Sequence, residues 1–168
     1  MAAPTILLVG TADTKSDELA FMRQHLQAQG VQVLLMDVGV LAAGAVPVDL
    51  SNQAVAQAAH TTLQAVIDSG DENSAMTLMA NGAAALAAQL YADGRIQGML
   101  ALGGSMGTDL AFDVAAVLPL GCPKVVVSTV AYSHLIPPER IPPDLIMVLW
   151  AGGLYGLNSL CQSALAQG

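Results

Sequence analysis

The chain has 168 residues, of which 54% are hydrophobic and 11% are charged, so it can bury a full core and is too apolar to be intrinsically disordered. Its formal net charge is −8 with only five basic residues, which excludes the basic face that duplex nucleic acid requires. So few charges leave an apolar surface, from which we expect a homodimer or a higher homo-oligomer.

The first 37 residues predict a β-helix-β unit. Residues 5–9 and 31–36 are short apolar runs typical of strands buried on both faces, and a helical pattern lies between them. Thr14 and Asp17 predict a capping box at the start of this helix, and Gly30 marks its end. The two strands should therefore be parallel, with a right-handed crossover.

Strand and helix alternate through the rest of the chain. The predicted helices cover residues 51–69, 73–92, 109–118 and 158–166, and the predicted strands cover residues 99–102, 124–129 and 144–150. This pattern predicts one α/β domain over residues 1–168, Rossmann-like and doubly wound around a mainly parallel sheet. Ligands of such sheets bind beyond the carboxyl ends of the strands.

Polar side chains follow the first predicted strand directly, at residues 10–15, and the candidate ligand-binding residues are Thr11, Asp13, Thr14 and Lys15. The free N–H groups at a helix start attract anions. Lys15 opposes the helix dipole, so a bound phosphate would explain its position. A solvated surface lysine is the alternative.

A glycine-rich segment follows the predicted strand 99–102, and its candidate ligand-binding residues are Gly103, Gly104, Ser105, Met106, Gly107 and Thr108. The three glycines allow positive φ and a close backbone approach, which an anion-binding nest requires. The segment matches neither a Walker A loop nor a full G-x-G-x-x-G fingerprint. A tight strand-to-helix turn without a ligand is the alternative.

Three further polar residues end predicted strands. Asp37 occupies the place of a ribose-binding acid in Rossmann-type domains, with a turn or capping role as the alternative. Ser128 and Thr129 could donate to a phosphate or simply end their strand. We recognise no nucleophile elbow, no paired carboxylates and no metal-ligand cluster, so the sequence predicts neither a reaction nor a metal site.

Several features bear on cellular location. Cys122 and Cys161 belong to no metal or redox motif, so we expect buried thiols in a reducing compartment. The chain begins without the basic residues of a signal peptide, and glycines interrupt the uncharged stretch 145–162. We therefore expect a cytoplasmic protein with no membrane span.

Segments 10–15, 103–108 and 118–131 together resemble the N-terminal ATP-binding domain of the family of plant inhibitors of tobamovirus RNA replication, which has bacterial and fungal relatives of unknown function. The resemblance implies a Rossmann-like fold that binds ATP. The contacts that it implies are Asp13, Thr14, Lys15, the loop after Asp37 that includes Gly39, and Gly104, Ser105, Met106 and Gly107.

The chain departs from the family pattern in three places. Relatives usually carry a second domain downstream, which is absent from this sequence. They carry an arginine before the helix that begins near residue 73, where this chain has Asp71 and Glu72. Residues 132–134, Tyr-Ser-His, replace a small Ser-Gly-acid segment.

The sequence thus predicts a domain that binds ATP or a related nucleotide, with or without Mg²⁺, and works with a partner domain or subunit. One alternative is the phosphate-binding half of a hydrolase or transferase that a second domain completes. Another is an interaction module that has lost its ligand.

Overall fold

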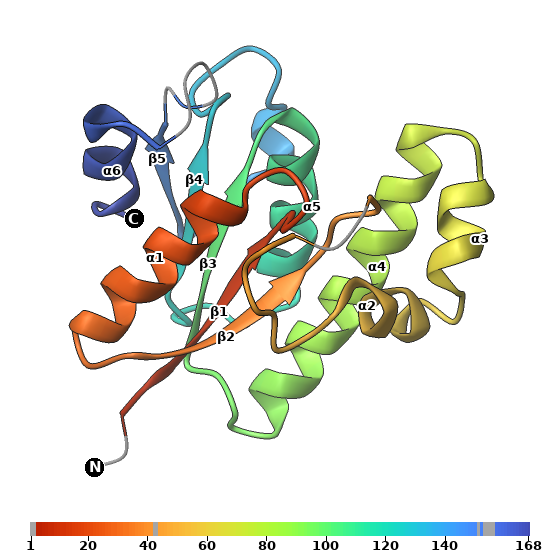
Figure 1. Ribbon diagram of the computed structural model, residues 1–168, viewed down its shortest axis with the longest axis horizontal. Helices are drawn as coiled ribbons and strands as arrows, with labels where there is room; N and C mark the ends of the chain where they lie inside the picture. The colour runs from red at the N-terminus through yellow and green to blue at the C-terminus, as the bar shows by residue number, and fades with distance from the viewer. Residues whose placement is uncertain (1–2, 42–43, 151, 153–156) are drawn as a thin grey trace.

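The computed structural model describes residues 3–41, 44–150, 152 and 157–168. Its centre is a five-stranded sheet in the order β2-β1-β3-β4-β5, in which every neighbouring pair of strands is parallel (Figure 1). The strands are β1 (Thr5–Gly10), β2 (Gln32–Asp37), β3 (Gly98–Gly103), β4 (Lys124–Ser128) and β5 (Leu145–Leu149). The predicted α/β class and parallel sheet are confirmed.

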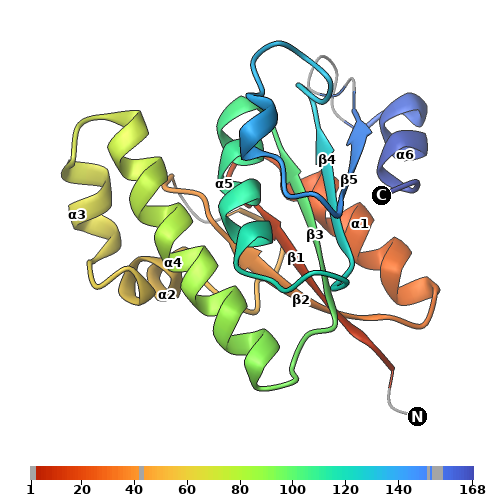
Figure 2. The same cartoon turned by 180° about the vertical axis from the view of Figure 1, so that it is seen from behind.

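Helices cover both faces of the sheet (Figures 1 and 2). One face packs against α1 and α6, and the other packs against α2, α4 and α5, with α3 outside α2 and α4. The α-helices are α1 (Ser16–Ala28), α2 (Asn52–Ala58), α3 (Leu63–Asp68), α4 (Glu72–Ala92), α5 (Ser105–Ala116) and α6 (Ser159–Leu165). Among the described residues, none of these helices is long and apolar enough to span a membrane.

Alternation along the central strands divides the core between the two faces. Leu8 of β1 packs on the α1 side with Leu19 and Met22, whereas Leu7 and Val9 pack on the α4 side. All of these side chains are essentially inaccessible to solvent. Successive strand residues point to opposite faces, so a strand covered on both sides has a nearly unbroken apolar sequence. This is why the strands could be located from the sequence.

The strand order defines where a ligand can bind. β1 lies between β2 and β3, so the chain crosses to one side of β1 after the first strand and to the other side after the second. The loops leaving β1 and β3 therefore diverge and leave a crevice between them, at the topological switch point. The first turns of α1, α4 and α5 all lie at this end of the sheet (Figure 1).

Three sequence-based predictions of local structure are wrong. The predicted helix 51–69 is two helices, because His60 adopts a left-handed conformation with φ of 58° and Thr62 caps α3 by accepting from the Ala65 amide. The predicted capping box at α1 is absent, since the Thr14 hydroxyl instead lies 2.7 Å from the Thr11 hydroxyl. Finally, α5 begins at Ser105 and not at residue 109.

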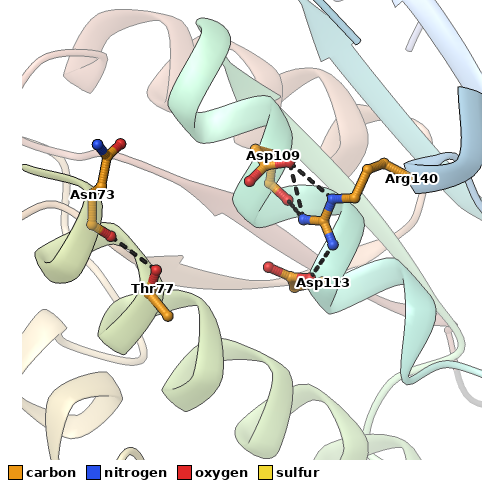
Figure 3. A network of polar contacts seen from close by, with 5 residues as sticks. All are labelled: Asn73, Thr77, Asp109, Asp113 and Arg140. Atoms are coloured by element: carbon orange, nitrogen blue, oxygen red, sulfur yellow. Dashed lines mark hydrogen bonds and ion pairs between the residues drawn. The ribbon is translucent and has the colours of Figure 1, made fainter. Parts of the chain in front are cut away.

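The long connection between β4 and β5 is tied to α5 by one arginine (Figure 3). Arg140 donates to Asp109 and Asp113, which lie one helical turn apart, with N–O distances of 2.9 Å in both ion pairs. The two carboxylates raise the pKa of Arg140, so it stays charged at any physiological pH. In the same view Thr77 donates to the backbone carbonyl of Asn73 within α4.

The outer strand β5 leaves apolar side chains in solvent. Ile146 and Leu149 are 61% and 53% exposed, and Tyr132 and Leu135 of the preceding connection are also largely exposed. The expected homo-oligomer stays a prediction. The expected burial of Cys122 and Cys161 as free thiols is confirmed.

Candidate functional site

A cavity of about 690 Å³ lies at the switch point, beyond the carboxyl ends of β1, β2 and β3. Its polar wall comes from the β1–α1 loop and from the start of α5, and consists of Thr11, Asp13, Thr14, Lys15, Gly104, Ser105, Met106 and Gly107. These eight residues were all predicted as ligand-binding residues from the sequence. The structure therefore brings together two segments that are about ninety positions apart in the chain.

The two helices that start at this wall have no side-chain cap. The N-cap residue of α1 is Lys15 and that of α5 is Gly104. Neither has a side-chain oxygen that could accept a hydrogen bond from a first-turn amide. The other described α-helices are capped by Ser51, Thr62, Asp71 and Asn158. Uncapped first-turn amides are free donors and carry the positive end of the helix dipole, so the starts of both helices present hydrogen-bond donors and partial positive charge at the cavity wall.

Lys15 is not the fully solvated surface cation that the sequence suggested as an alternative. Its ammonium nitrogen lies 5.5 Å from the centre of the Trp150 ring, and the residue is only partly exposed. A cation over an indole face is stabilised by about 0.5–1 kcal/mol at a partly solvated site. Trp150 thus holds the Lys15 side chain beside the cavity.

The glycines after β3 act by close packing and not through positive φ. Gly103, Gly104 and Gly107 are absent from the residues with positive φ, so the predicted nest geometry is wrong. A Cβ at Gly103 would lie 2.5 Å from the Gly107 carbonyl carbon, so glycine is needed there for α5 to turn back onto its strand. A Cβ at Gly104 would meet only the Thr129 hydroxyl, at 3.8 Å. Gly104 therefore leaves room for a ligand at the start of α5.

Asp37 does not line the cavity but binds the backbone of two loops that do. Its side chain is 4% exposed, and its Oδ1 atom accepts from the amides of Ala12 and Gly39, at 2.9 Å each. Burial raises the pKa of Asp37, although both amide hydrogen bonds oppose the shift. Asp37 thus joins the loop after β1 to the loop after β2. The carboxylate that reaches the cavity wall is Asp13, whose Oδ2 atom accepts from the Leu41 amide.

Four other predicted residues also lie outside the cavity lining, namely Gly103, Thr108, Ser128 and Thr129. The hydroxyls of Thr108 and Ser128 are both buried and lie 2.6 Å apart, which fastens α5 to the end of β4. The amide of Thr129 donates to the carbonyl of Gly103. These residues position the start of α5.

Apart from Gly39, which was predicted as a contact, the second wall of the cavity was not predicted from the sequence. It is apolar and comes from the loop after β2 and from one face of α3 and α4, with side chains of Val38, Val40, Leu41, Ile67, Ala75, Met76 and Met79, together with Gly39. The spacing of Ala75, Met76 and Met79 marks one helix face. That spacing alone does not distinguish a cavity wall from ordinary core packing.

The rim beside this wall is formed by Ser69, Gly70, Asp71 and Glu72. Asp71 caps α4, since its Oδ2 atom accepts from the amide of Ser74 at 2.9 Å and from the hydroxyl of Ser74 at 2.6 Å. These hydrogen bonds lower the pKa of Asp71. The Glu72 side chain is exposed and makes no hydrogen bond or ion pair with another described residue. The rim is therefore acidic.

The segment at residues 132–134 lies away from this cavity. Tyr132 and Ser133 instead line a separate hollow of about 330 Å³ beside β5, together with Ile136, Ile141 and Met147 among others. Tyr132 has φ of 63°, and its hydroxyl donates to the Met147 carbonyl at 2.6 Å. This departure from the family pattern therefore does not alter the wall of the strand-end cavity.

Comparison with known proteins places the chain in a family. Residues 4–168 match the model described as Uncharacterised protein family (UPF0261) N-terminal domain. The chain belongs to the UPF0261 family. A UPF0261 protein of Brucella suis is 59% identical over 98% of this chain and 40% of its own length. One of Clostridium tetani is 30% identical over 96% of this chain and 40% of its own length.

This UPF0261 domain thus spans about 40% of the length of these curated relatives. A more distant relative is the ToMV resistance protein Tm-1 of Solanum lycopersicum, which is 27% identical over 77% of this chain and 19% of the plant protein. The resemblance to a plant tobamovirus family is therefore confirmed at low identity, alongside bacterial UPF0261 proteins.

Proposed function

We propose that this UPF0261 domain binds a nucleotide in the strand-end cavity, with ATP or a related nucleotide as the ligand, with or without Mg²⁺. One observation carries the proposal: two helix N-termini without side-chain caps meet a lysine at the wall of one cavity. Backbone amides at helix starts bind phosphate without net positive charge on the protein. This accommodates a phosphate in a chain whose net charge is −8.

The remaining walls suit the other parts of a nucleotide. A volume of about 690 Å³ is within the range of roughly 300–1,000 Å³ that small-molecule sites occupy. The apolar side chains of Val40, Met76 and Met79 offer a surface for a flat base, opposite the polar wall around Lys15. A nucleotide has the same division into an apolar base and an anionic end.

We further propose that the domain acts together with a partner domain or subunit. The relatives are more than twice as long as the segment that this chain matches, so the remainder of such proteins can complete a site. A second candidate follows from the same length difference. The domain would then be the phosphate-binding half of a hydrolase or transferase whose reacting groups lie in that remainder.

Calorimetric titration with AMP, ADP and ATP tests the proposal. Lys15→Met should weaken nucleotide binding about 10- to 150-fold, because one charge-assisted hydrogen bond contributes roughly 1.5–3 kcal/mol. Arg95→Met is the matched control, since Arg95 is exposed and does not line the cavity. It should leave the affinity unchanged.

The result against the proposal is equally definite. If none of the three nucleotides produces heat or raises the melting temperature at millimolar concentration, nucleotide binding is ruled out as the function of this domain. An interaction module without a ligand would then be the better account.

A further inference from the structure

The cavity wall has an unusual charge balance for a site that would hold a polyphosphate. Lys15 is the single basic residue among the lining residues, whereas Asp13, Asp71 and Glu72 are acidic. The lysine and the starts of α1 and α5 are on one wall, and Asp71 and Glu72 are on the rim formed by the start of α4. All the positive character therefore lies on one wall, where Asp13 is the only carboxylate among the lining residues, and the other two carboxylates lie on the rim.

The other basic residues cannot shift this balance. Arg23, Lys124 and Arg140 form ion pairs with carboxylates elsewhere, each with an N–O distance of 2.9 Å or less. Arg95 follows the C-terminal end of α4, at the opposite end of the sheet from the cavity. Lys15 is thus the one basic side chain that the described structure offers to a ligand in this cavity.

The available positive character suffices for no more than a single phosphate. Each helix N-terminus is equivalent to roughly half a positive charge, so α1, α5 and Lys15 together supply about two positive charges, and the Asp13 carboxylate on the same wall offsets about one of them. A phosphate monoester carries about −1.5 to −2 at neutral pH. A second or third phosphate would add negative charge beyond this balance, in a cavity whose rim already carries carboxylates.

Glu72 is the rim carboxylate best placed to impose this limit. Asp71 accepts two hydrogen bonds from Ser74, which stabilise its carboxylate and lower the pKa of Asp71. The Oδ2 atom of Asp13 accepts from the Leu41 amide, and its buried Oδ1 atom has no hydrogen-bond partner among the described residues. The Glu72 side chain has no such partner among the described residues, so its charge is not offset by a hydrogen bond from the protein.

We propose that the cavity selects nucleotides with one phosphate group over nucleoside diphosphates and triphosphates, and that Glu72 is the residue that sets this selectivity. The inference rests on the proposed nucleotide-binding function. The ligand class is accordingly a nucleoside monophosphate, with its phosphate against the starts of α1 and α5.

The test compares AMP, ADP and ATP by calorimetry in a magnesium-free buffer with chelator and fixed ionic strength. AMP should bind about ten-fold more tightly than ATP, with ADP between them. Glu72→Gln should reduce the ratio of ATP to AMP dissociation constants about three-fold, which is the effect of one charge acting across several ångströms of partly solvated space. Glu139→Gln removes the same charge at an exposed site outside the cavity and should leave the ratio unchanged.

Each contrary result has a separate meaning. ATP binding as tightly as AMP without magnesium would overturn the monophosphate preference and leave nucleotide binding intact. An unchanged ratio in Glu72→Gln would overturn the role of Glu72. Failure of all three nucleotides to bind would overturn the proposed function and this inference with it.

Discussion

Two adjacent glycines at the end of β3 should separate the stability of the fold from the binding of the ligand. A methyl group on Gly103 would lie 2.5 Å from the carbonyl carbon of Gly107 and 2.6 Å from the amide nitrogen of Thr108. Backbone atoms must move to relieve these contacts, so Gly103→Ala should cost about 1–3 kcal/mol of folding free energy. In a domain of this size each kcal/mol lowers the melting temperature by about 2–4 °C.

Gly104→Ala should leave the stability of the fold nearly unchanged and should weaken ligand binding. Its φ of −77° suits any residue, and the nearest atom to an added methyl group is the Thr129 hydroxyl oxygen at 3.8 Å. Stability should therefore change by no more than about 0.5 kcal/mol. The methyl group would, however, stand at the cavity wall where a phosphate approaches the first amides of α5, so AMP binding should weaken at least ten-fold, or about 1.4 kcal/mol.

Thermal melts and calorimetric titrations of both variants give the comparison. The reasoning predicts a lower melting temperature for Gly103→Ala and weaker AMP binding with a normal melting temperature for Gly104→Ala. It is refuted if Gly104→Ala binds AMP as tightly as the parent chain. A normal melting temperature for Gly103→Ala would refute the packing argument.

Two further substitutions test the elements that frame the cavity. Gly82→Ala should lower the free energy of unfolding by about 1–3 kcal/mol, because the added methyl group would collide with the Val55 carbonyl of α2. This collision outweighs the helix propensity of alanine, which exceeds that of glycine by about 1 kcal/mol. A higher free energy of unfolding in chemical denaturation would contradict this. Asp71→Ala should lower the melting temperature at pH 7. The hydrogen bonds from Ser74 lower the pKa of Asp71 in the folded state. The stability that ionised Asp71 contributes is therefore complete above its ordinary pKa of 3.8 and is lost as the pH falls through the lower pKa of the folded state. The difference between variant and parent should therefore shrink in acid, and a constant difference would contradict the argument.

The strands could be predicted from the sequence to within about one residue, because burial on both faces leaves an apolar run that a glycine or a polar residue ends. The break between α2 and α3 could not. It depends on a left-handed conformation at His60, which is uncommon for a residue with a side chain. The start of α5 was placed too late because three glycines favour a loop over a helical turn when their packing partners are unknown.

Some residues of the candidate site could likewise be predicted from the sequence, and others could not. Residues that directly follow β1 and β3 could be assigned to the cavity, since parallel strands bring their carboxyl ends to one edge. The wall formed by α3 and α4 could not be assigned, because the sequence does not indicate which helix face meets the loop after β2. The contact between Lys15 and Trp150 joins residues that are far apart in the chain and needed the structure to be seen. Asp37 was placed correctly at a strand end, but its burial beneath the cavity depends on two loop amides.

Mapping backbone amide shifts by NMR during titration with AMP tests the central claim most directly. The account predicts that the largest shifts occur in residues 11–15 and 104–107, which form the polar wall of the cavity. Smaller shifts should follow along the rim at residues 69–72. Shifts centred instead on Tyr132, Ser133 and Met147 would place the nucleotide in the hollow beside β5 and would contradict the account.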